Sequence, residues 1–236
     1  SMFTMMNLER IVVGIQGLGI SETAYQNALA YAKERKQGKA NNSKTNDADV
    51  IIKHPDIRRS LMNMKSLTEG QRTLAFWVSQ LIDVSLNHSD KNVKDSAGDL
   101  VSLMTPVIKS FFSDTGMELT NDAIQVFGGY GYTKDQGIEQ LFRDNRITPI
   151  YEGTNSIQAI DLVYRKILNN KIFDNYIKQI TEETNEYGKN KNLILFVQKF
   201  QKYLELLNNF TSWLIQKNKS SKDDVSAACN DYLRVL

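Results

Sequence analysis

Residues 8–37 read LERIVVGIQGLGISETAYQNALAYAKERKQ. Apolar side chains recur in this stretch at steps of three and four residues, as in Ile11 and Ile15, which is the period of one face of an α-helix. Asn7 precedes the stretch and is a residue type that commonly caps helix N-termini. Gly38 follows it and is a common helix terminator. We therefore predict one long amphipathic helix that begins at Asn7 and ends at Gly38.

Further helical patterns follow a polar segment. Residues 39–49 are polar and almost featureless, so we expect an exposed, mobile loop. Pro55 is a residue type favoured at the first helical position, and it begins a second helix with apolar residues at three- and four-residue intervals. A third helix starts at about Asn92. Pro106 interrupts its pattern and is expected to kink the helix or to start a new segment.

Shorter helices are predicted in the second half of the chain. After Gly116, Thr120 is placed to cap a helix that stops at the paired glycines Gly128-Gly129. Helical pieces are also expected around Gly137–Arg143 and Asn155–Leu168.

From Ile172 onward the chain becomes richer in lysine and asparagine. A stripe with three- and four-residue steps predicts a seam buried inside a bundle, and it contains Leu193, Phe196, Phe200, Tyr203, Leu207, Phe210 and Leu214. No alternating strand pattern of convincing length is present. The predicted fold class is therefore all-α, an antiparallel helical bundle with additional C-terminal helices.

Composition excludes several classes of site. The 29 basic and 27 acidic residues are mixed along the chain and give a formal net charge of +2, without the concentrated basic face of a nucleic-acid-binding protein. Two histidines, His54 and His88, and the single Cys229 supply no zinc-type ligand set, so no metal site is expected. No apolar stretch is long enough for a transmembrane span. No signal peptide is evident, and Ser1-Met2 has the form of a cloning scar.

Two short motifs could carry chemistry. A Tyr-Glu-Gly-Thr sequence at residues 151–154 places Glu152 before a helix opened by Thr154 or Asn155. Taken alone, Glu152 is an ordinary capping or surface carboxylate. Gln125-x-x-Gly128-Gly129 taken alone is a helix stop, and it is not a Rossmann loop, because a helix precedes it and no G-x-G-x-x-G is present.

Together with Arg143-Asp144-Asn145-Arg146, which we interpret as structural, these motifs resemble the C-terminal region of acyl-CoA dehydrogenases. The resemblance runs from about Met2 to Lys166. It implies a C-terminal helical bundle over residues 1–168 and a helical extension over residues 169–236, packed on the bundle. The loop insertion and the extension look most like the larger bacterial subgroup of 3-methylmercaptopropionyl-CoA dehydrogenase-like proteins.

The resemblance implies roles for the residues of the later motif. Glu152 corresponds to the base that removes the α-proton of an acyl-CoA thioester while the β-hydrogen leaves as hydride to flavin N5, and its backbone N–H holds the thioester carbonyl. Gly153 corresponds to a substrate-contacting residue and Thr154 to a flavin-contacting one. Ser156 stands where some relatives carry a longer flavin-contacting side chain.

Further binding residues follow from the same resemblance. Gln125, Gly128 and Gly129 match the segment that contacts the adenosine and pyrophosphate of FAD across a dimer interface. Arg35 matches an arginine that reaches the FAD of the partner subunit, although a cation at a helix C-terminus also complements the helix dipole.

Asn7, Arg10 and Glu9 belong to the first helix of the resemblance. Asn7 and Arg10 match substrate-contacting positions. In some branches the base precedes this arginine, so Glu9 is an alternative to Glu152. Those branches generally lack the later glutamate, and this chain has both. We favour Glu152, with Glu9 complementing the positive end of its own helix.

The family's N-terminal helical domain and middle β domain are not in this sequence. FAD is therefore expected in the parent enzyme, and this chain alone is expected to be inactive and to bind flavin weakly or not at all. The implied partners are an acyl-CoA, electron-transfer flavoprotein or a similar acceptor, and a second copy in a homodimer or dimer of dimers. The implied location is the cytoplasm of a bacterium, or the mitochondrial matrix of a eukaryote. The alternative function is a stand-alone, non-catalytic helical module for oligomerisation or interaction.

Overall fold

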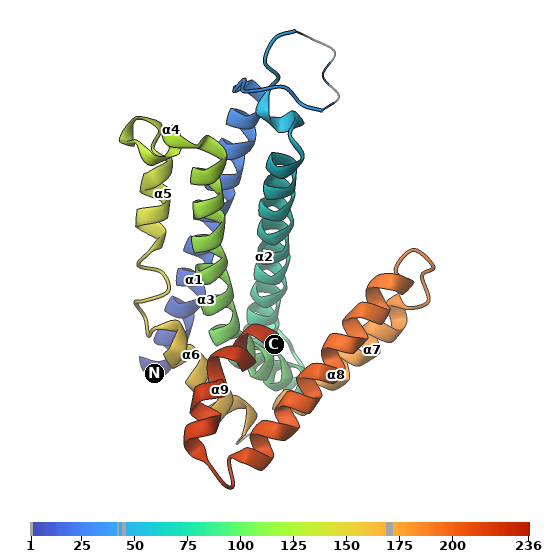
Figure 1. The fold of residues 1–236 in the computed structure, drawn as a ribbon. Coiled ribbons are helices and arrows are strands. Elements are labelled where there is room, and N and C mark those ends of the chain that lie inside the picture. The colour runs from blue at the N-terminus through green and yellow to red at the C-terminus, as the bar shows by residue number, and fades with distance from the viewer. Residues whose placement is uncertain (1, 42, 44–45, 169–171) are drawn as a thin grey trace. The chain divides into compact units, whose positions relative to one another are not determined.

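The structure is a computed structural model that describes residues 2–41, 43, 46–168 and 172–236, and Figure 1 shows it as a ribbon. Helices dominate, and the one bridge of strand type in the described part joins Lys36 and Val50. The α-helices are α1 (Met2–Glu34), α2 (Pro55–Asn87), α3 (Lys91–Phe127), α4 (Gly129–Tyr132), α5 (Ile138–Asn145), α6 (Asn155–Asp161), α7 (Ile172–Tyr187), α8 (Ile194–Lys217) and α9 (Lys222–Val235). Two 3₁₀ turns, η1 (Ile51–Lys53) and η2 (Lys134–Gln136), and a π-helical turn, η3 (Leu162–Ile167), complete the order. The predicted all-α class is confirmed.

The chain divides into two compact units. Unit 1 comprises Ser1–Trp77 and Ile108–Glu152, and unit 2 comprises Val78–Val107 and Gly153–Leu236. Helices α2 and α3 each contribute to both units. The predicted division at residue 168 rests on the sequence and stays a prediction.

Unit 1 is a bundle in which α1, α2, α3 and α5 lie side by side with alternating direction along the chain (Figure 1). Glycines let α1 approach α3 closely. A Cβ added at Gly17 would lie only 2.7 Å from the carbonyl oxygen of Phe112, and one added at Gly14 would lie 3.0 Å from that of Ile108. A side chain larger than hydrogen at either glycine would therefore push the two helices apart.

The core of unit 1 follows the predicted helical stripes. It is built from fully or nearly fully buried residues of α1, η1, α2, α3 and α5, namely Ala24, Tyr25, Ala28, Ala32, Ile51, Leu61, Met64, Leu119, Ala123, Val126, Phe127 and Ile138. Alanines on α1 make room for the larger side chains of its neighbours.

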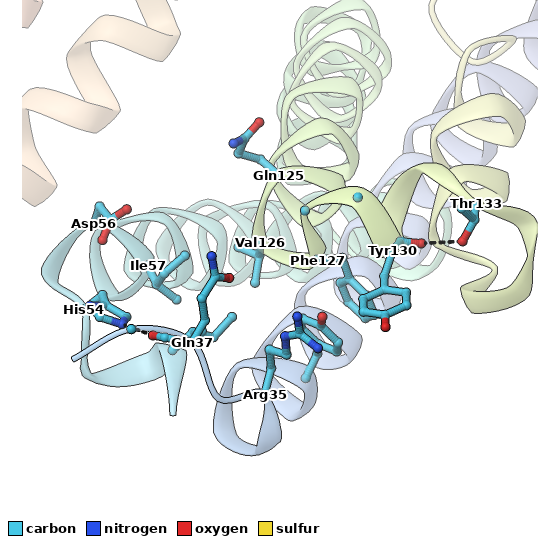
Figure 2. A pocket seen from close by; sticks show the side chains of 15 residues that line it. Arg35, Gln37, His54, Asp56, Ile57, Gln125, Val126, Phe127, Tyr130 and Thr133 are labelled. Atoms are coloured by element: carbon cyan, nitrogen blue, oxygen red, sulfur yellow. Dashed lines mark hydrogen bonds between the residues drawn. The ribbon is translucent and has the colours of Figure 1, made fainter. Parts of the chain in front are cut away.

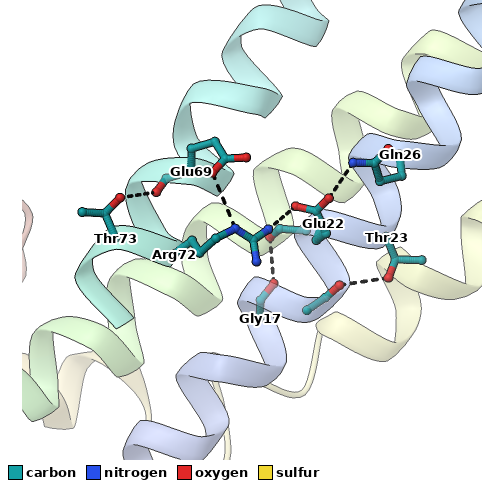
Figure 3. Close-up of polar contacts among 9 residues, drawn as sticks. Gly17, Glu22, Thr23, Gln26, Glu69, Arg72 and Thr73 are labelled. Atoms are coloured by element: carbon teal, nitrogen blue, oxygen red, sulfur yellow. Dashed lines mark hydrogen bonds and ion pairs between the residues drawn. The ribbon is translucent and has the colours of Figure 1, made fainter. Parts of the chain in front are cut away.

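A polar pair also joins α1 to α2 in unit 1 (Figure 3). The Arg72 guanidinium on α2 pairs with the Glu22 carboxylate on α1, and its Nε lies 3.5 Å from the Glu69 carboxylate one turn earlier. Gln26 Nε2 donates to the same Glu22 at 2.7 Å. This half-exposed network fixes the register of the two helices more than it adds stability.

The first helix is longer at its start and shorter at its end than the sequence predicts. Helix α1 begins at Met2, so Asn7 lies inside it and is not its N-cap, because the preceding methionines continue the helix readily. It ends at Glu34, where the chain turns to pair with residues 49–51. In that turn the Gln37 N–H donates to the Asp49 carbonyl at 2.9 Å, and the Asp49 N–H donates to the Gly38 carbonyl at 2.9 Å.

The side chain of Asp49 forms hydrogen bonds to residues within and just after the loop predicted from the sequence. Its side chain is buried and accepts hydrogen bonds from Lys53 Nζ at 2.6 Å and from the Ala40 N–H at 3.1 Å. The hydrogen bond from Lys53 is the main reason that the pKa of Asp49 lies well below its usual range. The expectation of an exposed segment is therefore wrong at Asp49, and residues 42, 44 and 45 lie outside the described residues.

Helix α3 runs unbroken through Pro106, so of the two expected outcomes, a kink or a new segment, the new segment is wrong. Pro106 and Gly116 both lie inside it, and Thr120 does not cap a new helix but donates its hydroxyl to the Gly116 carbonyl at 2.8 Å. Leu103 and Ile108, which flank the proline, are completely buried. Burial of this apolar face outweighs the one backbone hydrogen bond that proline removes.

In unit 2, helix α6 continues into the π turn η3, and α7, α8 and α9 follow. Tyr232 of α9 is completely buried, hydrogen-bonds Thr211 Oγ1 of α8 at 2.7 Å, and meets the Phe210 ring edge-on at 5.2 Å between centroids. Burial raises the pKa of the Tyr232 phenol. This contact anchors α9 on the C-terminal half of α8.

The predicted buried seam along α8 is only half correct. Leu207 and Leu214 are buried, whereas Phe196 is 71% and Tyr203 64% exposed. Helix α9 has 14 residues and α8 has 24, so α9 is too short to cover the whole stripe. Within the described residues, no helix is both long enough and apolar enough to cross a membrane.

Candidate functional site

A pocket of about 860 Å³ lies in unit 1 where α1 ends, α2 begins and α3 gives way to α4 (Figure 2). Its volume is in the range of small-molecule sites. The lining residues are Tyr31, Arg35, Gln37, Gly38, Ile51, His54, Asp56, Ile57, Gln125, Val126, Phe127, Gly128, Gly129, Tyr130 and Thr133. Four positions predicted from the sequence as cofactor contacts, Arg35, Gln125, Gly128 and Gly129, thus line one cavity.

Arg35 is held at the end of α1 by its own backbone and by an aromatic ring. Its N–H donates to the Tyr31 carbonyl at 2.8 Å, and its carbonyl accepts from the Ile51 N–H at 2.8 Å. The guanidinium carbon lies 5.2 Å from the centre of the Tyr130 ring, within the range of a cation–π contact. The arrangement fixes a permanent positive charge at the wall of the pocket.

The paired glycines expose backbone to the same pocket. Helix α3 ends at Phe127, and Gly128 adopts φ 63° and ψ −140°, a conformation that L-residues with a side chain rarely adopt. A Cβ built at Gly128 or at Gly129 would meet no atom within 4 Å, so the space beside both glycines is open. A ligand can therefore approach the peptide backbone here without a side chain in between.

The wall facing these glycines contains residues that the sequence motifs did not single out. His54 Nε2 lies 2.8 Å from the Gln37 carbonyl oxygen, which joins the start of α2 to the segment after α1. The Tyr31 and Phe127 rings stack with centroids 4.1 Å apart and form an apolar floor. Tyr130 follows the paired glycines directly, and an aromatic residue beside a glycine pair was the available signal for it.

Glu152 belongs to a second group of residues in unit 1. It lies in the turn after α5, is half-buried, and has φ 55°. The preceding Tyr151 donates its hydroxyl hydrogen bond to Gln16 of α1. Burial raises the pKa of Tyr151, and the negative charges of Glu152 and Glu9 add to that effect. Glu152 and Glu9, the two candidate bases, therefore both lie close enough to Tyr151 to raise the pKa of its phenol.

Lys109 of α3 stands behind this group. Its side chain is completely buried, and burial lowers its pKa to about 8. The carboxylates of Asp114 and Glu152 act in the opposite direction, and Arg10 on α1 adds to the lowering. Arg10, Lys109 and Glu152 thus form one electrostatically coupled group, in which Lys109 was missed by the sequence motifs. The sequence signal for the burial of Lys109 was its place among Thr105, Ile108 and Phe112 on one stripe of α3.

The turn that carries Glu152 is anchored by Asn145, which is completely buried. The Thr148 hydroxyl donates to the Asn145 carbonyl at 2.9 Å and lies 3.1 Å from its side-chain oxygen. Asn145 Nδ2 reaches the Ser113 carbonyl on α3 at 3.5 Å. Asn145 therefore contributes the structural role predicted for the Arg143–Arg146 segment. The Arg143 guanidinium lies 3.7 Å from the Glu139 carboxylate.

Of the remaining predicted residues, two lie on α1 next to Arg10 and three lie in unit 2. Asn7 is half-buried on α1, three residues before Arg10 and on the same helical face, whereas Glu9 is exposed. Gly153, Thr154 and Ser156 belong to unit 2. There the Thr154 hydroxyl caps α6 by accepting from the Ile157 N–H at 3.4 Å, as predicted for the start of this helix.

Other contacts occupy the neighbours of Thr154. The Gly153 carbonyl accepts from Gln158 Nε2 at 3.3 Å, and the Ser156 hydroxyl accepts from Asn230 Nδ2 of α9 at 3.3 Å. These contacts fix the start of α6 within unit 2.

The two groups in unit 1 lie at opposite ends of α1. Arg10 and the helix end at Glu34 are 24 residues apart, so the rise of an α-helix separates them by about 36 Å. The pocket at Arg35 and the group at Glu152 are therefore two separate sites along α1.

Comparison with known proteins gives consistent matches. The sequence model for the family described as acyl-CoA dehydrogenase, C-terminal domain, matches residues 1–168. The chain is 41% identical over 167 residues to 3-methylmercaptopropionyl-CoA dehydrogenase of Ruegeria pomeroyi. That alignment covers 71% of this chain and only 28% of that protein's length.

Two solved structures are similar over almost the whole chain. ACDH-11 of Caenorhabditis elegans, in complex with C11-CoA, has a TM-score of 0.79 at 22% identity, covering 97% of this chain and 37% of that one. An acyl-CoA dehydrogenase of Bacillus anthracis complexed with FAD has a TM-score of 0.75 at 20% identity, covering 99% and 39%. At these identities the two likenesses establish the fold, and they include the helices after residue 168.

Proposed function

The chain belongs to the acyl-CoA dehydrogenase family, and from this premise we propose that it works as the C-terminal helical part of an FAD-dependent acyl-CoA dehydrogenase. The reaction would remove one hydrogen from Cα and one from Cβ of an acyl-CoA thioester. The observation that carries the proposal is the left-handed Glu152, coupled to Arg10 and Lys109 in the region that matches the family.

Glu152 is proposed as the base. Its carboxylate takes the α-proton as the Cα–H bond breaks, and the thioester carbonyl, which gains negative charge, accepts a hydrogen bond from the Glu152 N–H. FAD, when bound, supplies the acceptor for the hydride that leaves Cβ. Asn7, Arg10 and Gly153 are the proposed substrate contacts, with Arg10 providing a fixed positive charge. Thr154 and Ser156 are proposed on the flavin side.

The pocket at the other end of α1 suits the adenosine and pyrophosphate half of FAD. Arg35 offers a guanidinium group, which pairs well with phosphate oxygens. Gly128 and Gly129 offer bare backbone, and the open space beside them leaves room for a ligand. Gln125 is the proposed polar contact at the end of α3. The residues present therefore fit the group.

The separation of the two ends of α1 supports a homodimer. One FAD is not expected to reach both Arg35 and Glu152 of the same chain, because Tyr151, beside Glu152, bonds to Gln16 of α1, and the 18 residues from Gln16 to Glu34 rise by about 27 Å. In the proposed dimer, each active site combines Glu152 of one subunit with the Arg35 pocket of the partner. An electron-transfer flavoprotein or a similar acceptor is the proposed partner that would take up the electrons of the reaction.

The base assignment is tested in the enzyme that carries this chain. Acyl-CoA is added to the FAD-loaded enzyme, and bleaching of the flavin absorbance is recorded for Glu152→Gln and Glu9→Gln. We expect Glu152→Gln to slow bleaching at least a hundredfold, since general bases contribute roughly 10²–10⁴-fold. Bleaching that survives Glu152→Gln and is abolished by Glu9→Gln would assign the base to the first helix.

The cofactor pocket is tested without catalysis. The FAD-free form of the enzyme that carries this chain is titrated with ADP by calorimetry, and Arg35→Ala is expected to weaken binding about tenfold through loss of a charge-assisted hydrogen bond. Arg59→Ala, an exposed arginine of α2 outside the pocket, is the matched control. ADP affinity that is unaffected by Arg35→Ala would reject the assignment. A chain that binds no ADP, in an enzyme that shows no bleaching, would favour the non-catalytic module.

A further inference from the structure

An apolar groove lies between α7 and α8 in unit 2, and the proposed reaction does not use it. Its volume is about 550 Å³, and its walls are Ile180, Glu183, Thr184, Tyr187, Leu193, Phe196, Val197, Lys199, Phe200 and Tyr203. The large side chains of the groove face water, with Phe196 71%, Tyr203 64% and Tyr187 59% exposed. Apolar patches of this kind on a folded protein mark interaction sites.

The groove continues a stripe that is already an interface. Phe196, Phe200 and Tyr203 repeat at the same three- and four-residue steps as Leu207 and Leu214, which α9 and its neighbours bury. Contact with α9 includes the Phe210–Tyr232 ring pair, and α9 is ten residues shorter than α8. The uncovered half therefore has the spacing that receives another helix.

Charge on the two walls identifies what this partner is. Helix α7 carries four acidic residues and one lysine, whereas α8 carries three lysines and one glutamate. Glu183 lines the groove on the α7 side and Lys199 on the α8 side. A two-fold axis that runs parallel to the two helices, above the open side of the groove, brings the α7 wall of one copy against the α8 wall of the other. The charges of the two walls are then complementary.

We propose that the α7–α8 groove is a self-association surface, in which two copies pack their hairpins into a four-helix arrangement. The contact is isologous, so Glu183 of each copy faces Lys199 of the other, and the pairing occurs twice. In the centre of the contact, the side chains of Phe196, Phe200 and Tyr203 become buried. The acidic α7 wall disfavours an anionic membrane surface as the occupant.

This surface lies outside residues 1–168, which the family model matches, and it is independent of the proposed dimer at the FAD pocket. The two associations are separable by experiment. Substitutions in the groove change one assembly step, and substitutions at Arg35 change the other.

The first experiment compares two phenylalanines of almost equal exposure. Phe196→Asp places a charge in the groove, while Phe76→Asp places one on α2 in unit 1, where the phenylalanine is 70% exposed. Sedimentation equilibrium of this chain is expected to give a dissociation constant at least tenfold higher for Phe196→Asp and an unchanged value for Phe76→Asp. Equal effects of the two variants, or a wild-type chain that is monomeric at its highest soluble concentration, would overturn the proposal.

The second experiment uses charge reversal. Glu183→Lys and Lys199→Glu are each expected to raise the dissociation constant roughly tenfold, because each places like charges opposite one another twice. An equimolar mixture of the two variants is expected to recover association as a hetero-complex. The double variant, which carries Glu183→Lys and Lys199→Glu in one chain, is measured beside the mixture. If the double variant associates and the mixture does not, the pair forms within one chain and the proposal fails.

A membrane is the remaining occupant to be separated. The wild-type chain is mixed with vesicles of neutral lipid and with vesicles containing phosphatidylserine, and both are sedimented. We expect the protein to stay in the supernatant. Binding to either vesicle that Phe196→Asp abolishes, together with a monomeric chain in solution, would assign the groove to lipid and reject self-association.

Discussion

At the residue scale, Glu152 combines an unfavourable backbone with the proposed chemistry. Among the residues that the structure describes, it is the one non-glycine residue with positive φ. Such a conformation costs on the order of 1–3 kcal/mol and persists only where the surroundings impose it. Here the buried Asn145 and the Tyr151–Gln16 hydrogen bond fix the segment that leads into Glu152. The strain is located at the residue proposed to take the proton.

Because of this strain, we expect glycine to be more favourable than alanine at position 152, which is the reverse of their order inside a helix. Glu152→Gly is expected to leave the chain roughly 1 kcal/mol more stable than Glu152→Ala, because alanine keeps the Cβ that disfavours positive φ. Urea denaturation of both variants measures the difference. At Glu118, an exposed position inside α3, the order should be the opposite, with glycine about 1 kcal/mol less stable than alanine. The same order at both positions would contradict a strained Glu152.

Lys109 predicts an unusual dependence of stability on pH. Its pKa is about 8 in the folded chain and 10.5 in the reference state, so the unfolded chain binds more protons between these values. Stability therefore rises with pH in this window, and the cost of the buried charge at pH 7, roughly 3 kcal/mol, is relieved towards pH 10.

The measurement is the difference in unfolding free energy between wild type and Lys109→Met. Taking the difference removes effects shared by both proteins, such as the buried Cys229, whose raised pKa lowers stability above about pH 9. The wild type should gain on the variant as the pH rises from 7.5 to 10. Lys65→Met, at an exposed position of α2, should track the wild type. A pH-independent difference for Lys109→Met would show that the ammonium group is well solvated.

At the element scale, the close approach of α1 and α3 depends on the absence of a side chain. Gly17→Ala is expected to lower stability by about 1–3 kcal/mol, because its Cβ would lie 2.7 Å from the Phe112 carbonyl oxygen. Gly19→Ala, two residues on, meets nothing within 4 Å and should raise stability by up to about 1 kcal/mol. Thermal denaturation of the pair separates packing from helix propensity. A Gly17→Ala variant as stable as Gly19→Ala would show that the helices can move apart freely.

Helical periodicity in the sequence predicts most of the elements and fails where tertiary burial overrides a local signal. Pro55 correctly predicts the start of α2. Pro106 does not predict a break, because the buried faces around it hold α3 together. The stripe on α8 correctly predicts a helix, but periodicity carries no information on the length of the helix that covers it.

The candidate site could be predicted as far as its motifs extend. Arg35 is distant in sequence from Gln125, Gly128 and Gly129, and all four line one pocket, while their role as cofactor contacts stays a prediction. Tyr130 and Lys109 were not predicted. Lysine on a mixed-charge chain normally lies on the surface, and the one sequence signal that Lys109 is buried was its place on the apolar stripe of α3.

At the scale of the whole molecule, α2 and α3 join the two units because each runs through both. Unfolding of unit 2 would expose the end of α2 and the first half of α3, so we expect a single cooperative transition. The two tryptophans serve as separate probes, since Trp77 lies in unit 1 and Trp213 in unit 2. Trp77→Phe and Trp213→Phe should give coincident fluorescence melting curves. Two separate transitions would show that the helices break between the units, as Pro106 would favour.

The length of α1 has a genetic consequence if each active site draws on two subunits. An allele that encodes Glu152→Gln would specify an enzyme without its proposed base, and an allele that encodes Arg35→Ala would specify an enzyme with a weakened cofactor pocket. In a mixed dimer, one site would inherit both lesions and the other neither. Co-expression of the two alleles should therefore restore about half of the wild-type turnover per mixed dimer, whereas alleles altered at the same end of α1, such as Arg10 and Glu152, should fail to complement.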